Sequence, residues 1–113
     1  MTVDELIRRW DDFTTEMAPG YPTSVHDYAN ALGLRTRIAE LEAAAVPLAA
    51  HLARRVTESD ARFREATIEL SVPFAGYQAP RSAWWWFRRP AEMGPELEAD
   101  LARVVPREEA PIT

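Results

Sequence analysis

The sequence predicts an all-α fold: a small irregular bundle of three main helices and a short C-terminal helix, closed by a long loop rich in aromatic residues and proline. Two observations lead to this prediction. Apolar residues recur at three- and four-residue spacings through most of residues 2–70 and again in 95–104, as on one face of a helix. Residues 72–94 lack this spacing and contain three prolines and two glycines, so they are expected to form the loop.

Length and composition narrow the class of protein. A chain of 113 residues indicates one domain, residues 1–105, followed by a flexible tail, residues 106–113. The absence of cysteine excludes disulfides and thiolate metal ligands. No apolar run approaches the roughly 18 residues of a membrane span, and the acidic N-terminus does not resemble a signal peptide. A cytoplasmic protein without membrane contact is therefore expected, and its net charge of −5 does not favour nucleic-acid binding.

The first helix is expected over residues 2–17, because six apolar residues share one of its faces. These residues are Val3, Leu6, Ile7, Trp10, Phe13 and Met17. Thr2 followed by Glu5 predicts a capping box, in which each side chain bonds the backbone amide of the other. The helix should end near Pro19 and Gly20.

A second helix should begin at Ser24, a favoured cap, with Asp27 three residues later. Gly33 interrupts its apolar stripe, and it is either a turn or a residue inside a continuous helix that costs about 1 kcal/mol relative to alanine. Pro47 should stop or kink the helix, and proline also suits the first position of a third helix.

The third helix is expected to run from Pro47 to Leu70 or Ser71, with the first helix lying along the two helices on either side of Pro47. Residues 83–88 could form a short strand, but the chain offers no evident partner strand. The last helix should span 95–104, with proline in its first turn and acidic residues near its N-terminal dipole.

Residues 27–29 followed by 33–34 resemble the first helix and turn of a helix-turn-helix DNA-binding motif. Such motifs place a small residue where the two helices touch and a glycine four residues later, and Ala29 and Gly33 match both. The β-branched residue normally found ten positions after the alanine is replaced here by Ala39. The resemblance covers residues 24–42 and implies a transcription regulator.

In that regulator the second helix would carry Arg35 and Arg37 as DNA contacts. The same helix also carries Glu40 and Glu42, which repel phosphate. The acidic balance of the chain therefore favours ordinary packing helices, and the regulator is the alternative interpretation.

Catalytic and metal-binding patterns are absent from the sequence. His26 and His51 are its two histidines, and neither belongs to a metal-ligand spacing. Nucleophile-elbow, phosphate-loop and dinucleotide patterns do not occur either. We therefore expect no enzyme activity, no metal and no cofactor.

The run Trp84-Trp85-Trp86-Phe87 poses the main functional question. In an extended segment Trp84 and Trp86 would face one side, and Trp85 and Phe87 the other. We expect the first pair to complete the core, together with Phe74 and Tyr77, as an aromatic lid. The second pair would then be left for contact with a partner.

Three arginines flank this run and make residues 71–94 the basic part of an acidic chain. Tryptophan and arginine dominate binding hot spots, so the sequence predicts a small protein-binding protein of accessory, immunity or antitoxin-like type, with a partner of unknown identity. The predicted contact residues are Trp85, Phe87, Arg88, Arg89 and Arg81. A homodimer and a small-ligand pocket under the loop remain open alternatives.

Overall fold

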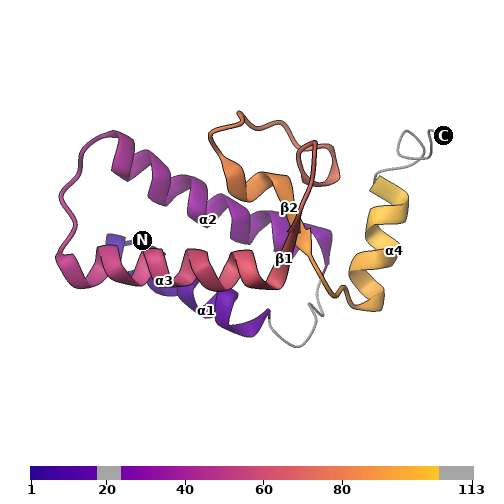
Figure 1. The fold of residues 1–113 in the computed structure, drawn as a ribbon, viewed down its shortest axis with the longest axis horizontal. Helices are drawn as coiled ribbons and strands as arrows, with labels where there is room; N and C mark the ends of the chain where they lie inside the picture. The colour runs from indigo at the N-terminus through magenta and orange to yellow at the C-terminus, as the bar shows by residue number, and fades with distance from the viewer. Residues whose placement is uncertain (18–23, 105–113) are drawn as a thin grey trace.

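The computed structural model describes residues 1–17 and 24–104, and it confirms a mainly helical fold (Figure 1). The four α-helices are α1 (Val3–Glu16), α2 (Val25–Ala43), α3 (Ala50–Ala66) and α4 (Pro95–Val104). A two-stranded antiparallel sheet, β1 (Thr67–Glu69) and β2 (Arg88–Pro90), adds an element that the sequence did not predict. Two short 3-10 helices, η1 (Phe74–Gly76) and η2 (Trp84–Phe87), lie between the strands. The tail predicted at 106–113 lies outside the described residues.

Helix α1 begins with the predicted capping box. The Thr2 side chain accepts a hydrogen bond from the Glu5 backbone N–H at 3.1 Å, and the Glu5 carboxylate accepts from the Thr2 N–H at 3.2 Å. Its apolar face buries Leu6, Ile7 and Trp10 against α2 and α3. The expected end of the helix at Pro19 lies outside the described residues.

Helix α2 begins at the predicted cap, where the Ser24 hydroxyl accepts from the Asp27 N–H at 3.2 Å. The helix continues through Gly33 without a turn (Figure 1). A Cβ added to Gly33 would have no atom within 4 Å, so packing does not require glycine there. The turn that a helix-turn-helix motif would need at Gly33 is therefore absent from α2, while DNA binding by residues 24–42 stays a prediction.

Helices α2 and α3 are distinct, and the non-helical residues 44–49 connect them. Ala45 adopts a left-handed φ of 58°, and the Val46 N–H donates to the Leu41 carbonyl at 3.0 Å, which closes the end of α2. Pro47 follows this reversal in extended chain, and α3 begins at Ala50. The prediction that Pro47 starts the third helix is wrong, because the chain must first complete the reversal.

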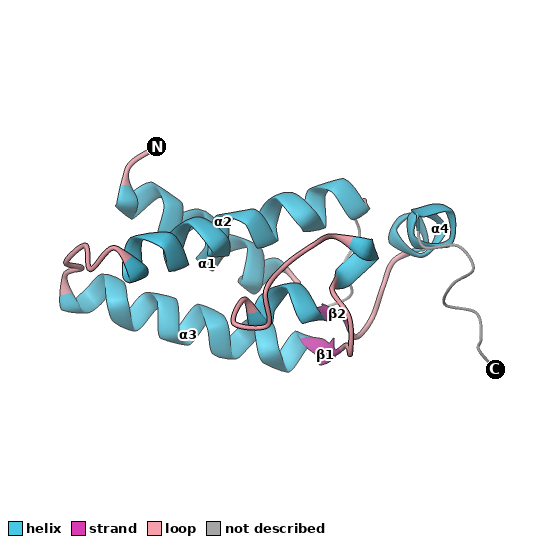
Figure 2. Cartoon of the chain, turned by 90° about the horizontal axis from the view of Figure 1, so that it is seen from above, coloured by secondary structure: helices cyan, strands magenta, loops and turns pink. Residues whose placement is uncertain are grey.

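Helix α3 ends at Ala66, earlier than the predicted Leu70 or Ser71. The β-branched residues that follow enter β1, whose Thr67 pairs with Pro90 and whose Glu69 pairs with Arg88. The strand considered at residues 83–88 is instead mostly the 3-10 helix η2, and β2 begins at Arg88; its partner β1 comes from residues that the apolar spacing had assigned to a helix. The segment between the strands lies over α2 and α3 (Figure 2).

Helix α4 has the predicted bounds and buries Leu97 completely. Its Asp100 carboxylate accepts a hydrogen bond from the Val25 backbone N–H at 3.1 Å, so α4 is attached to the first turn of α2. In the described part of the chain, no helix combines the length and apolar character needed to cross a membrane.

Candidate functional site: an aromatic groove

The four aromatic residues of η2 alternate in burial, but in the opposite sense to the prediction. Trp85 and Phe87 are 4% and 7% exposed and belong to the interior, whereas Trp84 and Trp86 are half-buried at the surface. The segment is a 3-10 turn, preceded by a hydrogen bond from the Ala83 N–H to the Pro80 carbonyl. This curvature, which an extended chain lacks, turns the second pair inward.

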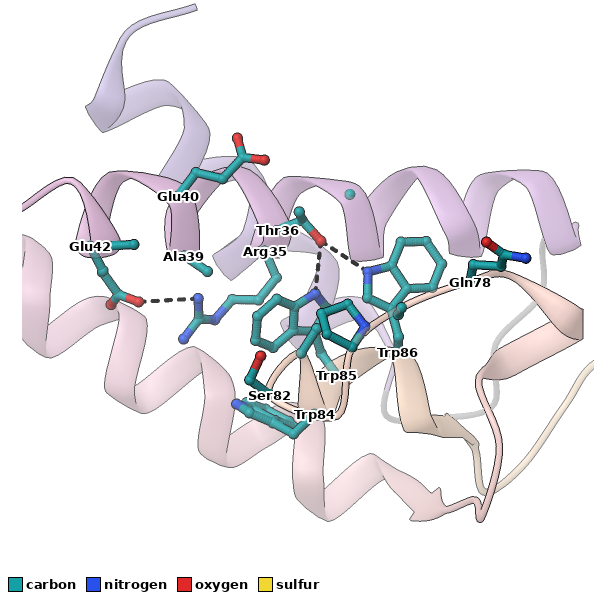
Figure 3. A pocket seen from close by; sticks show the side chains of 15 residues that line it. Arg35, Thr36, Ala39, Glu40, Glu42, Gln78, Ser82, Trp84, Trp85 and Trp86 are labelled. Carbon is teal, nitrogen blue, oxygen red and sulfur yellow. Dashed lines mark hydrogen bonds and ion pairs between the residues drawn. The ribbon is translucent and has the colours of Figure 1, made fainter.

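One hydroxyl of α2 holds this segment in place. Trp85 Nε1 and Trp86 Nε1 both donate to Thr36 Oγ1, at 3.0 and 2.9 Å (Figure 3). The Thr36 hydroxyl in turn donates to the Leu32 carbonyl at 3.3 Å. Because a hydroxyl has one proton and two lone pairs, Thr36 has no hydrogen-bonding capacity left.

Arg35 lies beneath the groove, paired with Asp60 of α3. Its Nε and Nη2 donate to the two carboxylate oxygens at 2.9 and 3.0 Å. Trp10 Nε1 donates to the same carboxylate at 3.0 Å, and the guanidinium lies 4.8 Å from the centre of the Trp85 ring. Arg35 is buried, so the prediction that it contacts DNA is wrong. Arg37 is exposed.

The arginines predicted to contact a partner have contacts within the chain. Arg88 Nε donates to Thr67 Oγ1 at 2.7 Å, which links the end of α3 to β2. Arg89 donates to the Pro90 carbonyl at 3.0 Å, and the Arg81 guanidinium lies 4.9 Å from the centre of the Phe87 ring. Their role toward a partner stays a prediction, and with Phe87 buried it would depend on the arginines themselves.

An open groove of about 770 Å³ lies between α2 and residues 78–86 (Figure 3). Trp84, Trp85 and Trp86 line one side. The other side consists of α2 residues, among them Gly33 and Arg35, which the sequence had already singled out, and Thr36, which it had not. No local pattern could have identified Thr36, because its importance comes from tryptophans about fifty positions away.

The charged residues that line the groove and are exposed to solvent are acidic. Glu40 and Glu42 are exposed and line it, and the Glu42 carboxylate lies 3.5 Å from Arg35 Nη1. On the α3 side, the Arg64 guanidinium lies 3.9 Å from the centre of the Trp84 ring. The groove therefore combines aromatic surface with carboxylates.

Comparisons with known proteins identify no relative of this chain. A scan against protein-family models finds no match, and searches of curated proteins and of solved structures find no significant similarity. Across residues 1–17 and 24–104, no three histidine, aspartate or glutamate side chains come together as a possible metal site.

Proposed function

We propose that the chain is a small protein-binding module without catalytic activity, and that it holds a segment of its partner in the aromatic groove. The observation that carries this proposal is the partial exposure of Trp84 and Trp86 along an open groove, while Trp10 and Trp85 are buried. Tryptophan is enriched among the residues that contribute most to binding. The volume of the groove is also within the usual range of binding sites.

The rigidity of the groove wall supports the same function. Trp86 is fixed by its hydrogen bond to Thr36 and by the Tyr77 ring, whose centre lies 5.3 Å away. Trp84 lies edge to face against Trp85 at 5.7 Å. Anchors that are already ordered lose little conformational entropy on binding, which favours affinity. An accessory or immunity-like protein would act in this way, by covering a surface of its partner.

A bulky side chain at Gly33 tests the proposal. Gly33 lines the groove and has open space at its Cβ position, so Gly33→Leu should obstruct the groove while α2 stays folded. The matched control is Asn30→Leu, on an exposed position of the same helix outside the groove lining. Circular dichroism should show the same helix content in both variants.

The binding measurement is recovery of partners from the cells that make the protein. A partner retained by the wild type and Asn30→Leu, but lost with Gly33→Leu, would support the groove as the contact surface. Equal retention by all three proteins would place the contact elsewhere. Failure of the wild type to retain any protein, even after cross-linking, would contradict a protein-binding role.

A further inference from the structure

We infer, on the basis of the proposed function, that the partner segment inserts an arginine side chain into the groove. The guanidinium would lie against the tryptophan surface and pair with Glu42. Three properties of the groove favour an arginine: its hydrogen-bond donors, its uncompensated charge and its aromatic faces.

The donors at the centre of the tryptophan wall are already engaged inside the chain. The indole N–H groups of Trp85 and Trp86 and the hydroxyl of Thr36 all have partners. Two nitrogens of Arg35 bond Asp60, and its third, Nη1, is buried without a hydrogen-bond partner, 3.5 Å from a Glu42 carboxylate oxygen. An anionic ligand needs free donors, so these engaged groups would not serve a carboxylate or a phosphate.

On its α2 side the uncompensated charge of the groove is negative, whereas Arg64 lies against Trp84 on the α3 side. Arg35 and Asp60 neutralise each other, with side chains that are 7% and 12% exposed. Glu42 comes into contact with this neutral pair, and its side chain is 46% exposed. Its carboxylate therefore adds a net negative charge at the end of the tryptophan wall, where a cation would be stabilised.

The aromatic faces in this region already receive guanidinium groups. Arg35 lies over Trp85, Arg64 over Trp84 and Arg81 over Phe87, at 3.9 to 4.9 Å from the ring centres. The electron-rich face of an aromatic ring attracts cations. A guanidinium is planar and more weakly hydrated than an ammonium, so arginine fits such a surface better than lysine.

Three capped pentapeptides test the inference, with arginine, citrulline or glutamate at the centre of Ala-Leu-X-Leu-Ala. Citrulline keeps the shape of arginine and removes its charge. Binding is followed by the indole N–H resonances of Trp84 and Trp86 in the full-length protein. We expect the arginine peptide to bind about tenfold more tightly than the citrulline peptide and more tightly still than the glutamate peptide.

A charge-neutralising variant identifies the carboxylate involved. Glu42→Gln should weaken binding of the arginine peptide about two- to fivefold, and high salt should have a similar effect. Glu58→Gln is the matched control, because Glu58 is exposed on α3 and does not line the groove. It makes the same change in net charge and should leave the affinity unaltered.

Other results of these experiments would overturn the inference. Equal binding of the arginine and citrulline peptides, or binding of none of the three, would overturn arginine recognition. The retention experiment with Gly33→Leu would still decide whether the groove binds a partner. Self-association of the wild type that Gly33→Leu abolishes would assign the groove to a second copy and overturn the inference as well.

Discussion

Arg35 of α2 and Asp60 of α3 form a two-fold hydrogen-bonded ion pair in the interior, with nitrogen–oxygen distances of 2.9 and 3.0 Å. The same carboxylate accepts a hydrogen bond from Trp10 of α1, and the guanidinium lies against the Trp85 ring. One polar pair therefore contacts all three long helices and the wall of the groove. Removing either member would leave a buried charge without its partner.

Replacing one member of this pair should strongly destabilise the fold. We expect Asp60→Ala to lower the free energy of unfolding by about 3–5 kcal/mol, since Arg35 would remain buried and keep only its longer contact with the exposed Glu42. The double variant Arg35→Met with Asp60→Leu should lose less, because no buried charge remains. Urea unfolding followed by circular dichroism measures both.

The control for this comparison is Glu58→Ala, an exposed position two residues earlier on the same helix. Its effect should stay within about 0.5 kcal/mol. If Asp60→Ala were no more costly than this control, the ion pair would contribute little to the fold. A double variant less stable than Asp60→Ala would show that the pair itself gives net stability.

Thr36 offers a test of the groove wall. Thr36→Val keeps the shape of the side chain and removes the acceptor of both indole N–H groups. We expect a loss of about 1–3 kcal/mol from the two unsatisfied donors, together with shifts of the Trp85 and Trp86 indole resonances. Thr36→Ser keeps the hydroxyl and should preserve these resonances. Similar spectra for the valine and serine variants would contradict the shared hydrogen bond.

Features that depend on neighbours in the chain could be predicted from the sequence. The caps at Thr2 and Ser24 involve residues three positions apart, so the pattern of side chains defines them. The bounds of α4 follow in the same way from Pro95 and its periodic apolar residues. These local signals account for the correct prediction of a mainly helical fold.

Features that depend on distant partners could not be predicted. Thr67 is in a strand because Pro90 pairs with it, and its own neighbourhood continued the apolar spacing of a helix. Trp85 faces inward because residues 84–87 form a 3-10 turn, which packs against α2, far away in the sequence. Alternation identified two pairs of aromatic residues correctly, but it could not determine which pair faced the core.

The capping box of α1 should make stability depend on pH. The hydrogen bond from the Thr2 backbone N–H lowers the pKa of Glu5 below its ordinary value of 4.5, with smaller contributions from the N-terminal amine and nearby arginines. Because the pKa is lower in the folded state, ionised Glu5 stabilises the fold above the unfolded pKa. This contribution is lost as the pH falls through the folded pKa.

Melting temperatures of Glu5→Gln and the wild type between about pH 5 and pH 3 test this prediction. The variant should show a shallower decrease, since its side chain cannot be protonated in this range. Glu16→Gln, at an exposed position near the other end of α1, should keep the slope of the wild type. A wild-type slope in Glu5→Gln would contradict the role of the capping box.

Ala45 occupies a helix-terminating position that glycine usually takes. Its φ of 58° is left-handed, which costs a residue with a Cβ about 1–2 kcal/mol. Ala45→Gly removes that strain but gives the unfolded chain more freedom, so a net gain of about 0.5 kcal/mol is expected. Ala44→Gly, one residue earlier at a φ of −82°, should destabilise the protein. Urea unfolding measures the change in the free energy of unfolding of both variants. A loss of stability in Ala45→Gly would contradict the assigned turn.

Gly33 presents the opposite case, a glycine in a place that suits alanine. It lies inside α2, and an added Cβ would meet no atom within 4 Å. Gly33→Ala should therefore raise the free energy of unfolding by about 0.5–1 kcal/mol, because alanine loses less backbone entropy in a helix. A helix-turn-helix with its turn at this glycine would instead be destabilised, so the sign of the change in urea unfolding distinguishes a continuous α2 from a turn.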